Sequence, residues 1–169
     1  MTDINLWLDS YDDIYSDFDS RQYMKRRVSE DFLHELRSEM KYKGHRADNI
    51  MLLLPSEKRN ENIEKIIRAS ISNFLNNQFQ SQQEKCRKKL YSGVSLLIAG
   101  IIVILTNSWI NYLAHPSFII TTLRVLLEPA GWFLLWAALD FLFYDLGNLK
   151  KEKEFYKKIS KMYINFKSS

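Results

Sequence analysis

The chain has 169 residues, a formal net charge of +4 and a single cysteine, Cys86. One cysteine excludes an intrachain disulfide, which argues against a disulfide-held secreted scaffold and favours a reducing compartment. The charge is unevenly distributed, because residues 1–20 contain six aspartates and no lysine or arginine, whereas basic residues gather at 21–27, at 85–89 and from 150 onward.

The start of the chain predicts a short strand followed by a structured loop. Ile4, Leu6 and Leu8 recur at every second position, which is the period of a β-strand. The first residues have neither a basic segment nor an apolar core, so we expect no cleavable signal peptide. Residues 10–21 are acidic but rich in aromatic and apolar side chains, which indicates an ordered loop.

Aspartates in and beside this loop are the weak metal candidates of the sequence. Carboxylate oxygens are the ligands that Mg²⁺ and Ca²⁺ prefer. The spacing does not match an EF-hand loop, because the required glycine and terminal glutamate are absent. We therefore expect neither metal nor cofactor, and expect the carboxylates to pair with Arg21, Arg26 and Arg27. The candidates are Asp9, Asp12, Asp13, Asp17 and Asp19.

A helix and a second strand are predicted next. Ser29 is a good N-cap, acidic residues follow it, and apolar residues then recur at three- and four-residue spacing up to Gly44. The apolar run 50–54, stopped by Pro55, predicts a buried strand.

The clearest amphipathic pattern extends from Ile63 to Phe79. Nothing before Leu90 breaks a helix, so this helix either continues into the apolar segment that follows or frays in the glutamine-rich stretch 76–83. The order strand–helix–strand–helix predicts a small α/β (or α+β) domain with two parallel strands. Two strands are few for a sheet, so we expect an open edge that binds a protein partner or a second copy.

Residues 90–146 predict a transmembrane hairpin. The segment 90–105 has no charged residue, and with its continuation through Tyr112 it reaches about 20 residues, the length that spans ~30 Å of hydrocarbon. A second apolar run, 129–146, follows a break at 115–117. Small residues on the first span suit close packing of another helix. These are Gly93, Ser95, Ala99 and Gly100.

Basic residues flank both ends of the hairpin and are sparse between them. The positive-inside rule therefore predicts that both termini are cytoplasmic, in a bacterial inner membrane. Lysines directly beside a span favour anionic lipid headgroups over nucleic acid as the partner. The headgroup candidates are Lys85, Arg87, Lys88, Lys89, Lys150, Lys151 and Lys153.

Three charged residues fall within or near the second apolar run. Arg124 and Glu128 are four apart and can pair on a helix. Pro129 suits the first turn of a new helix, so we expect an interfacial helix before it and the second span after it. The alternative is one tilted, kinked span. Asp140 is an intramembrane carboxylate, a candidate for contact with a partner helix or a water-filled path; alternatively, it lies near the inner headgroups.

Motifs for catalysis are missing from the sequence. His34, His45 and His115 have no zinc spacing, and there is no P-loop, no dinucleotide-binding glycine motif and no C-x-x-C. Cys86 lies among lysines, which is only a weak indication of a reactive or acylated thiol. We expect a protein that is not an enzyme.

Several short segments resemble an uncharacterised family of small bacterial two-span membrane proteins with a cytoplasmic N-terminal domain. The resemblance implies a bacterial inner-membrane setting and no particular activity. The segments are 8–14, 17–21, Leu54-Pro55 with Arg59, Glu128-Pro129, Trp136, Leu139 and 143–146.

Together these patterns predict an inner-membrane protein whose cytoplasmic domain binds a protein partner or self-associates. The rival hypothesis is an oligomeric pore with Asp140, Arg124 and Glu128 in a polar intramembrane path. The expected segments are a cytoplasmic domain at 1–82, a basic juxtamembrane helix at 83–89, spans at 90–113 and 129–146, an outer loop and interfacial helix at 114–128, and a basic tail at 147–169.

Overall fold

The computed structural model describes residues 2–43, 47–113 and 117–168. The expectations that concern Gly44, His45, His115 and Pro116 lie outside the described residues. The chain divides into two compact units. We call Met1–Gln80 with Glu154–Ser169 the α/β unit, and Ser81–Lys153 the helical unit.

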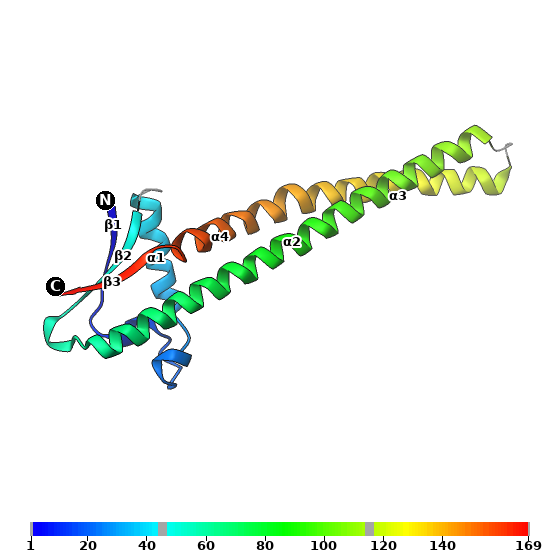
Figure 1. Ribbon diagram of the computed structural model, residues 1–169. Coiled ribbons are helices and arrows are strands. Elements are labelled where there is room, and N and C mark those ends of the chain that lie inside the picture. Colours follow the sequence, from blue (N-terminus) through cyan, green and yellow to red (C-terminus); the bar gives the residue numbers. More distant parts are fainter. Residues whose placement is uncertain (1, 44–46, 114–116, 169) are drawn as a thin grey trace. The chain divides into compact units, whose positions relative to one another are not determined.

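The α/β unit is built on a three-stranded parallel sheet (Figure 1). Its strands are β1 (Thr2–Trp7), β2 (Ala47–Leu54) and β3 (Tyr163–Ser168), and β2 lies in the centre. Both strands predicted from the sequence are confirmed, as is their parallel pairing.

The third strand corrects the sequence-based division of the chain. Residues 147–169 are not a basic tail, because they continue a helix and then return to the sheet as β3. The α/β unit therefore does not end at residue 82. A two-residue period marks this strand, since Ile164 and Phe166 are buried while Tyr163, Asn165 and Lys167 are exposed.

Helices pack on the sheet through one apolar core. Helix α1 (Glu30–Lys43) begins after Ser29, whose hydroxyl accepts a hydrogen bond from the Asp31 amide at 3.1 Å, as expected of an N-cap. The first part of α2 (Glu61–Leu113) and the last part of α4 (Leu146–Ile159) complete the cover. The helical residues of this core are Phe32, Leu33, Leu36, Met40, Ile67, Ile71, Leu75, Tyr156 and Ile159.

The loop between β1 and α1 is ordered, as the sequence predicts. It forms two short 3-10 helices, η1 (Tyr11–Ile14) and η2 (Tyr23–Lys25), and a third, η4 (Ser56–Lys58), follows β2. Tyr11, Ile14 and Tyr15 are buried, whereas Phe18 is fully exposed. Its aromatic side chains thus anchor the loop at its base.

Two long helices form the helical unit. Helix α2 is continuous from Glu61 to Leu113, so it does not fray in the glutamine-rich stretch. Helix α3 (Phe118–Asp140) contains Pro129 in its interior, which corrects the helix boundary expected there. A π-helical segment, η5 (Phe141–Asp145), joins α3 to α4. Of the two alternatives for residues 118–146, a continuous helix is the one observed.

Candidate functional site: an uncovered sheet face and the charged groups of the hairpin

One face of the sheet is covered by helices and the other is not. The residues that point to the helices are buried in all three strands, and α1, the start of α2 and the end of α4 all lie on that side (Figure 1). They are Ile4, Leu6, Ile50, Leu52, Leu54, Ile164 and Phe166. The alternate residues form a second face that no described segment of this unit covers.

This uncovered face carries an exposed aromatic side chain at each end, Trp7 at the carboxyl end of β1 and Tyr163 at the amino end of β3, beside Asn49. The strand register places Trp7 beside Leu53 and Leu53 beside Lys167. Trp7 is 61% exposed, and its indole donates a hydrogen bond to Asp9 at 3.3 Å. Tyr163, on β3, is 76% exposed.

The middle of the same face is more polar. Met51, which is partly buried, lies between exposed Asn5 and exposed Asn165. Parallel sheets are normally covered on both faces, and exposed apolar patches with polar rims mark interaction sites. The uncovered face is therefore the best interaction surface of the α/β unit.

A partly buried ion pair lies at the carboxyl end of the sheet. Arg59 donates two hydrogen bonds to Glu64, at 2.8 and 3.0 Å, and a third to the Ser168 hydroxyl at 3.2 Å. The Tyr11 hydroxyl donates to Glu64 at 3.2 Å and accepts from the Asn60 amide at 2.8 Å. The cluster thus joins the segments that follow β1 and β2 to the last residue of β3.

Electrostatics in this cluster favour the charged forms of Arg59 and Glu64 and the neutral form of Tyr11. Hydrogen bonding from Arg59 lowers the pKa of Glu64, and the same bond raises the pKa of Arg59. Burial raises the pKa of Tyr11. Because Arg59 and Glu64 bind protein groups on both sides, the arrangement fixes the fold at this edge. Sequence analysis assigned no role to Glu64, since an isolated Arg–Glu spacing of five carries no signal.

The acidic loop is held by its own arginines. Asp12 pairs with Arg26, and Asp19 with Arg21 at 2.7 Å, so the expected pairing with these two arginines is present. Arg27 contributes its backbone amide, which donates to Asp19 at 2.8 Å. The bonds from Arg21 are the main reason that the pKa of Asp19 lies below its usual range.

The other aspartates of the loop do not converge on one point. Asp13 accepts hydrogen bonds from the backbone amides of Asp9 and Ser10, as part of a capping box, and Asp17 is exposed. In the part of the chain that the structure describes, no three His, Cys, Asp or Glu side chains are placed to hold a metal ion.

Arg124 contacts the other helix of the hairpin. Its Nη2 donates to the Ile110 carbonyl at 3.1 Å, in the last turn of α2, where carbonyls lack intrahelical partners. A cation near a helix C-terminus is also favoured by the helix dipole. Glu128 is exposed and, among the described residues, forms no ion pair with Arg124.

Asp140 and Asp145 differ in environment although both adjoin η5. Asp145 pairs with Lys89 at 2.6 Å, and the Lys89 amine also lies 3.9 Å from the centre of the Phe141 ring. Asp140 is exposed on the outward side of α3. The carboxylate of Asp140 makes no hydrogen bond or ion pair with any described residue.

Glycines bring the two helices of the hairpin close together. A Cβ atom at Gly93 would lie 2.8 Å from Leu142, one at Gly100 would lie 3.0 Å from Leu135, and one at Gly131 would lie 2.6 Å from Ile104. The helix that packs on Gly93 and Gly100 therefore belongs to the same chain. Ser95 is exposed and donates to the Ser92 carbonyl at 2.9 Å, and Ala99 is partly buried.

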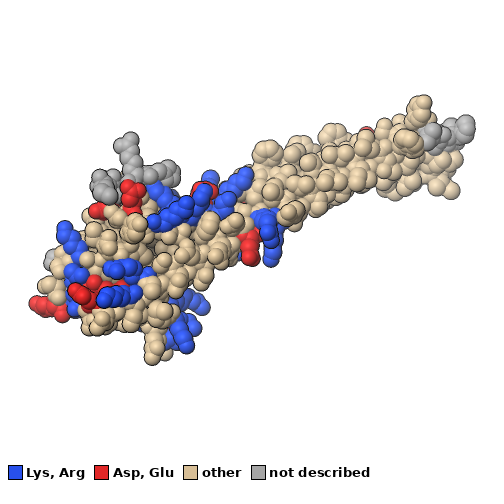
Figure 2. All heavy atoms as spheres, viewed as in Figure 1, with Lys and Arg blue, Asp and Glu red and all other residues tan. Residues whose placement is uncertain are grey.

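The remaining candidates are distributed over the surface. Most of the basic headgroup candidates are exposed, and Lys89 and Lys153 are partly buried. Along most of the helical unit the face seen in Figure 2 has almost no charged side chain. His34 is exposed and Cys86 is a buried free thiol.

The structure contains two helices that are long and apolar enough to cross a membrane, Glu61–Tyr112 and Phe118–Ile159. Comparisons with protein-family models, with curated proteins and with solved structures find no match for this chain.

Proposed function

We propose that this chain is a bacterial inner-membrane protein, anchored by its helical hairpin, whose cytoplasmic α/β unit binds a protein partner through the uncovered sheet face. The observation that carries this proposal is a parallel sheet with one face covered by helices and the other open. Trp7 and Tyr163 are exposed on that open face. Large aromatic side chains of this kind dominate the energy of protein interfaces.

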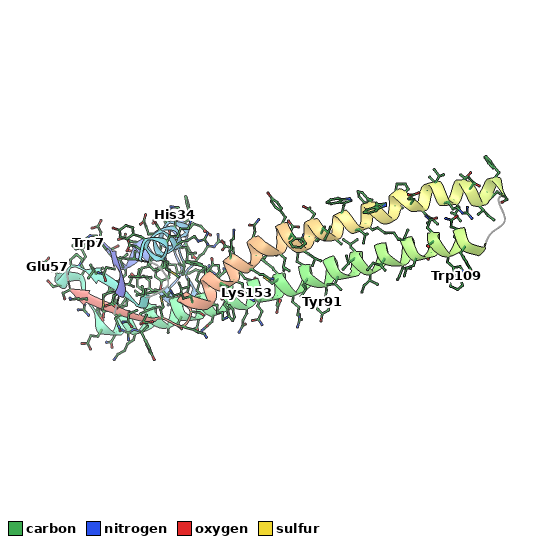
Figure 3. All side chains as sticks on the ribbon, turned by 90° about the horizontal axis from the view of Figure 1, so that it is seen from above. Trp7, His34, Glu57, Tyr91, Trp109 and Lys153 are labelled. Carbon is green, nitrogen blue, oxygen red and sulfur yellow. The ribbon has the colours of Figure 1, made fainter. Side chains whose placement is uncertain are left out.

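The exposure of the hairpin supports the membrane anchor. Of the most apolar 18-residue window in each helix, only 11% and 6% is buried. A core helix of a water-soluble protein would bury its apolar face, whereas a helix in lipid exposes it. Tyr91 and Trp109 point away from the opposite helix (Figure 3) and would suit the two membrane interfaces.

The basic flanks support the orientation. Arg87, Lys88, Lys150 and Lys151 are exposed and adjoin the apolar segments at the same end of the hairpin. Anionic lipids of the cytoplasmic leaflet attract such residues by about 1 kcal/mol each. The proposed orientation therefore has both termini in the cytoplasm and Ser117 outside.

Reporter fusions test the anchor and its orientation. Fusions after Gln80 and after Ser169 should report the cytoplasm, and a fusion at Ser117 should report the outside. A chain that alkaline carbonate releases from membranes would contradict the anchor, and a periplasmic C-terminus would contradict the hairpin.

Site-specific photo-crosslinking in cells tests the sheet face. A photoreactive phenylalanine analogue at Trp7 or Tyr163 should yield a protein adduct. The same analogue at Tyr42, an aromatic residue of α1 that is 88% exposed, is the matched control. An adduct of twice the chain mass identifies a second copy, and any other mass a different protein. Equal yields at all three positions would refute binding through this face.

An oligomeric pore is the second candidate, and the observation that favours it is the exposed carboxylate of Asp140, which pairs with no residue that the structure describes. Arg124 is engaged by the Ile110 carbonyl, so the polar path would depend on Asp140 rather than on an Arg124–Glu128 pair. Flux across liposomes containing the purified chain tests this function. Flux equal to that of empty liposomes over a range of pH and salts would exclude it.

A further inference from the structure

We propose that copies of this chain pack side by side in the bilayer, with Asp140 on the outward face of α3 hydrogen-bonded to Ser95 on the outward face of α2 of the next copy. This inference rests on the proposed membrane anchor. It deepens that proposal by naming a second copy as the partner of the hairpin and the residues that join the two copies.

The first step is the environment of Asp140. Its neighbours on the outward side of α3 and η5 are large and exposed: Trp132, Phe133 and Trp136 precede it, and Phe143 and Tyr144 follow it. With no described partner inside its own hairpin, the carboxylate would face hydrocarbon alone. Ionisable residues in a span are costly there and almost always pair with another polar group.

The depth of Asp140 follows from the Lys89–Asp145 pair. That pair closes the basic end of the hairpin, and Asp140 lies five residues, more than one helical turn, further into the apolar segment. An aspartate side chain is too short to extend over that distance to the headgroups. A donor within the bilayer is therefore required.

The second step is the register of the hairpin. Gly93 is opposite Leu142, Gly100 is opposite Leu135, and Gly131 is opposite Ile104. These contacts run in opposite directions along α2 and α3 at equal steps. The same register places Ser95 at the level of Asp140 and, on either side, Ala99 at the level of Trp136 and Ser92 at the level of Phe143.

The third step is the size of the outward-facing side chains at these levels, which are small on α2 and large on the opposite helix. Ser92 and Ser95 are exposed and Ala99 is partly exposed, so α2 presents small side chains at three successive positions. At the same three levels α3 and η5 present Trp136, Asp140 and Phe143. Small side chains allow large ones from another helix to approach closely, and a serine hydroxyl can donate across the contact.

The fourth step identifies the occupant as a second copy. Copies inserted with the same orientation are related by rotation about the membrane normal, so residues at equal depth meet. The Ser95 hydroxyl donates to the Ser92 carbonyl within its own helix, and rotation about one bond redirects it to an incoming carboxylate.

The contact joins different faces, α2 of one copy and α3 of the next. A two-fold contact between two α3 faces would instead bring the two Asp140 carboxylates together, which like-charge repulsion disfavours. A contact between different faces generates a ring when the rotation closes.

Disulfide trapping in isolated membranes tests the contact with the full chain. Two differently tagged versions, both with Cys86→Ser, are co-expressed: one carries Ala99→Cys and the other Trp136→Cys, so that Asp140 and Ser95 remain. Mild oxidation should link the two tags. The control pair is Ile102→Cys with Trp136→Cys, which also uses exposed positions. Ile102 lies three residues beyond Ala99 along α2 and points in a different direction from the helix axis. This control pair should link at most weakly.

Asp140 variants in the same trapping pair then isolate the hydrogen bond. Asp140→Asn retains an acceptor and should preserve the linked product. Asp140→Leu should lower its yield roughly three- to thirtyfold, the range expected for one interhelical hydrogen bond.

Each result has a definite meaning. A membrane-inserted chain with no link between the tags, or with equal yields for Asp140→Leu and Asp140→Asn, would overturn this contact and leave the anchor standing. A chain absent from the membrane fraction would overturn the anchor and the contact together. Links that form mainly between two copies of Trp136→Cys would show the two-fold arrangement and overturn the one proposed.

Discussion

The α/β unit and the helical unit use apolar residues in opposite ways. In the α/β unit, three strands, parts of three helices and one loop enclose a core of large side chains, and charged groups such as Arg59 and Glu64 pair with one another. In the helical unit, the helix-to-helix contact depends on glycines, while large apolar side chains are exposed. Removal of apolar side chains from water stabilises the α/β unit. The helical unit, whose apolar side chains are exposed, needs an apolar solvent such as lipid.

The two units also differ in the kind of surface that each offers to a partner. The α/β unit leaves one sheet face open after its core is complete. The helical unit leaves a carboxylate, Asp140, among aromatic residues on its outward surface. The first surface suits a partner in water, and the second suits a helix in lipid.

The largest effect should come from removing β3, which tests whether the two units are independent. Deletion of residues 163–169 removes the buried Ile164 and Phe166, each worth about 1.5–3 kcal/mol, and the hydrogen bonds to β2. The loss is on the order of 5 kcal/mol, comparable with the whole stability of a small domain. Hydrogen exchange should show β2 unprotected while residues 93–104 stay protected.

Asn165→Ala is the matched control, because Asn165 lies on the same strand but points to the uncovered face. It should leave the protection of β2 unchanged. A fragment of residues 1–80 lacks β3 and should also fail to melt cooperatively. Persistent protection of β2 in the deletion variant would show that β3 is dispensable.

Close helix packing should be the next most sensitive feature. Gly131→Ala places a Cβ atom 2.6 Å from Ile104, so we expect a loss of about 1–3 kcal/mol in the association of the two helices. Energy transfer between fluorophores on α2 and α3, followed through denaturation in mixed micelles, measures this loss.

Gly147→Ala is the control in the same unit, because no heavy atom lies within 4 Å of its added Cβ. There alanine should be neutral or stabilise the helix by up to about 1 kcal/mol. Equal effects of the two variants would argue against glycine-dependent packing. Melting of the α/β unit should be unchanged in both.

The Arg59–Glu64 pair should make the α/β unit sensitive to pH. Glu64→Gln is expected to lower the free energy of unfolding by about 2 kcal/mol at neutral pH, because a buried charged hydrogen bond is lost. Since the folded pKa of Glu64 is lowered, its contribution is fully present above the unfolded pKa of about 4.3 and is lost as the pH falls through the lower, folded pKa.

Urea denaturation of both proteins at pH 7 and at progressively lower pH measures this dependence. The two curves should converge at acid pH. The exposed Glu57→Gln should change stability by less than about 0.5 kcal/mol. A constant difference between wild type and Glu64→Gln at every pH would mean that the carboxylate charge is not the stabilising feature.

The smallest effect on folding is expected on the uncovered sheet face. Trp7→Ser should change the free energy of unfolding by less than about 1 kcal/mol, because the indole is 61% exposed. The same variant should remove the crosslink formed from position 163, whereas Trp7→Tyr should retain it. A variant that unfolds the α/β unit would assign Trp7 to the fold instead of to binding.

Much of the secondary structure could be predicted from local patterns. The alternation of Ile4, Leu6 and Leu8, the run 50–54 and the capped helix after Ser29 all correspond to observed elements. The presence of two long apolar helices also follows from the sequence alone, although the start of the second one does not. These features depend on residues close together in the chain, which is why a linear pattern reports them.

Partners from distant parts of the chain could not be predicted in the same way. The alternation at Ile164 and Phe166 was present but was obscured by the lysines around it, and only pairing with β2 identifies it as a strand. Likewise, the four-residue spacing of Arg124 and Glu128 predicted a pair, whereas Arg124 binds the Ile110 carbonyl.

What the sequence determined by itself is which segments are apolar, on which face, and over what length, because these properties are written in the spacing of neighbouring residues. The tertiary structure decided which faces meet. It placed β3 beside β2, continued α3 through Pro129, paired Lys89 with Asp145 and gave Asp140 no partner among residues 2–43, 47–113 and 117–168. Each of these outcomes depends on packing and hydrogen bonding between residues far apart in the chain, and local spacing does not encode that choice.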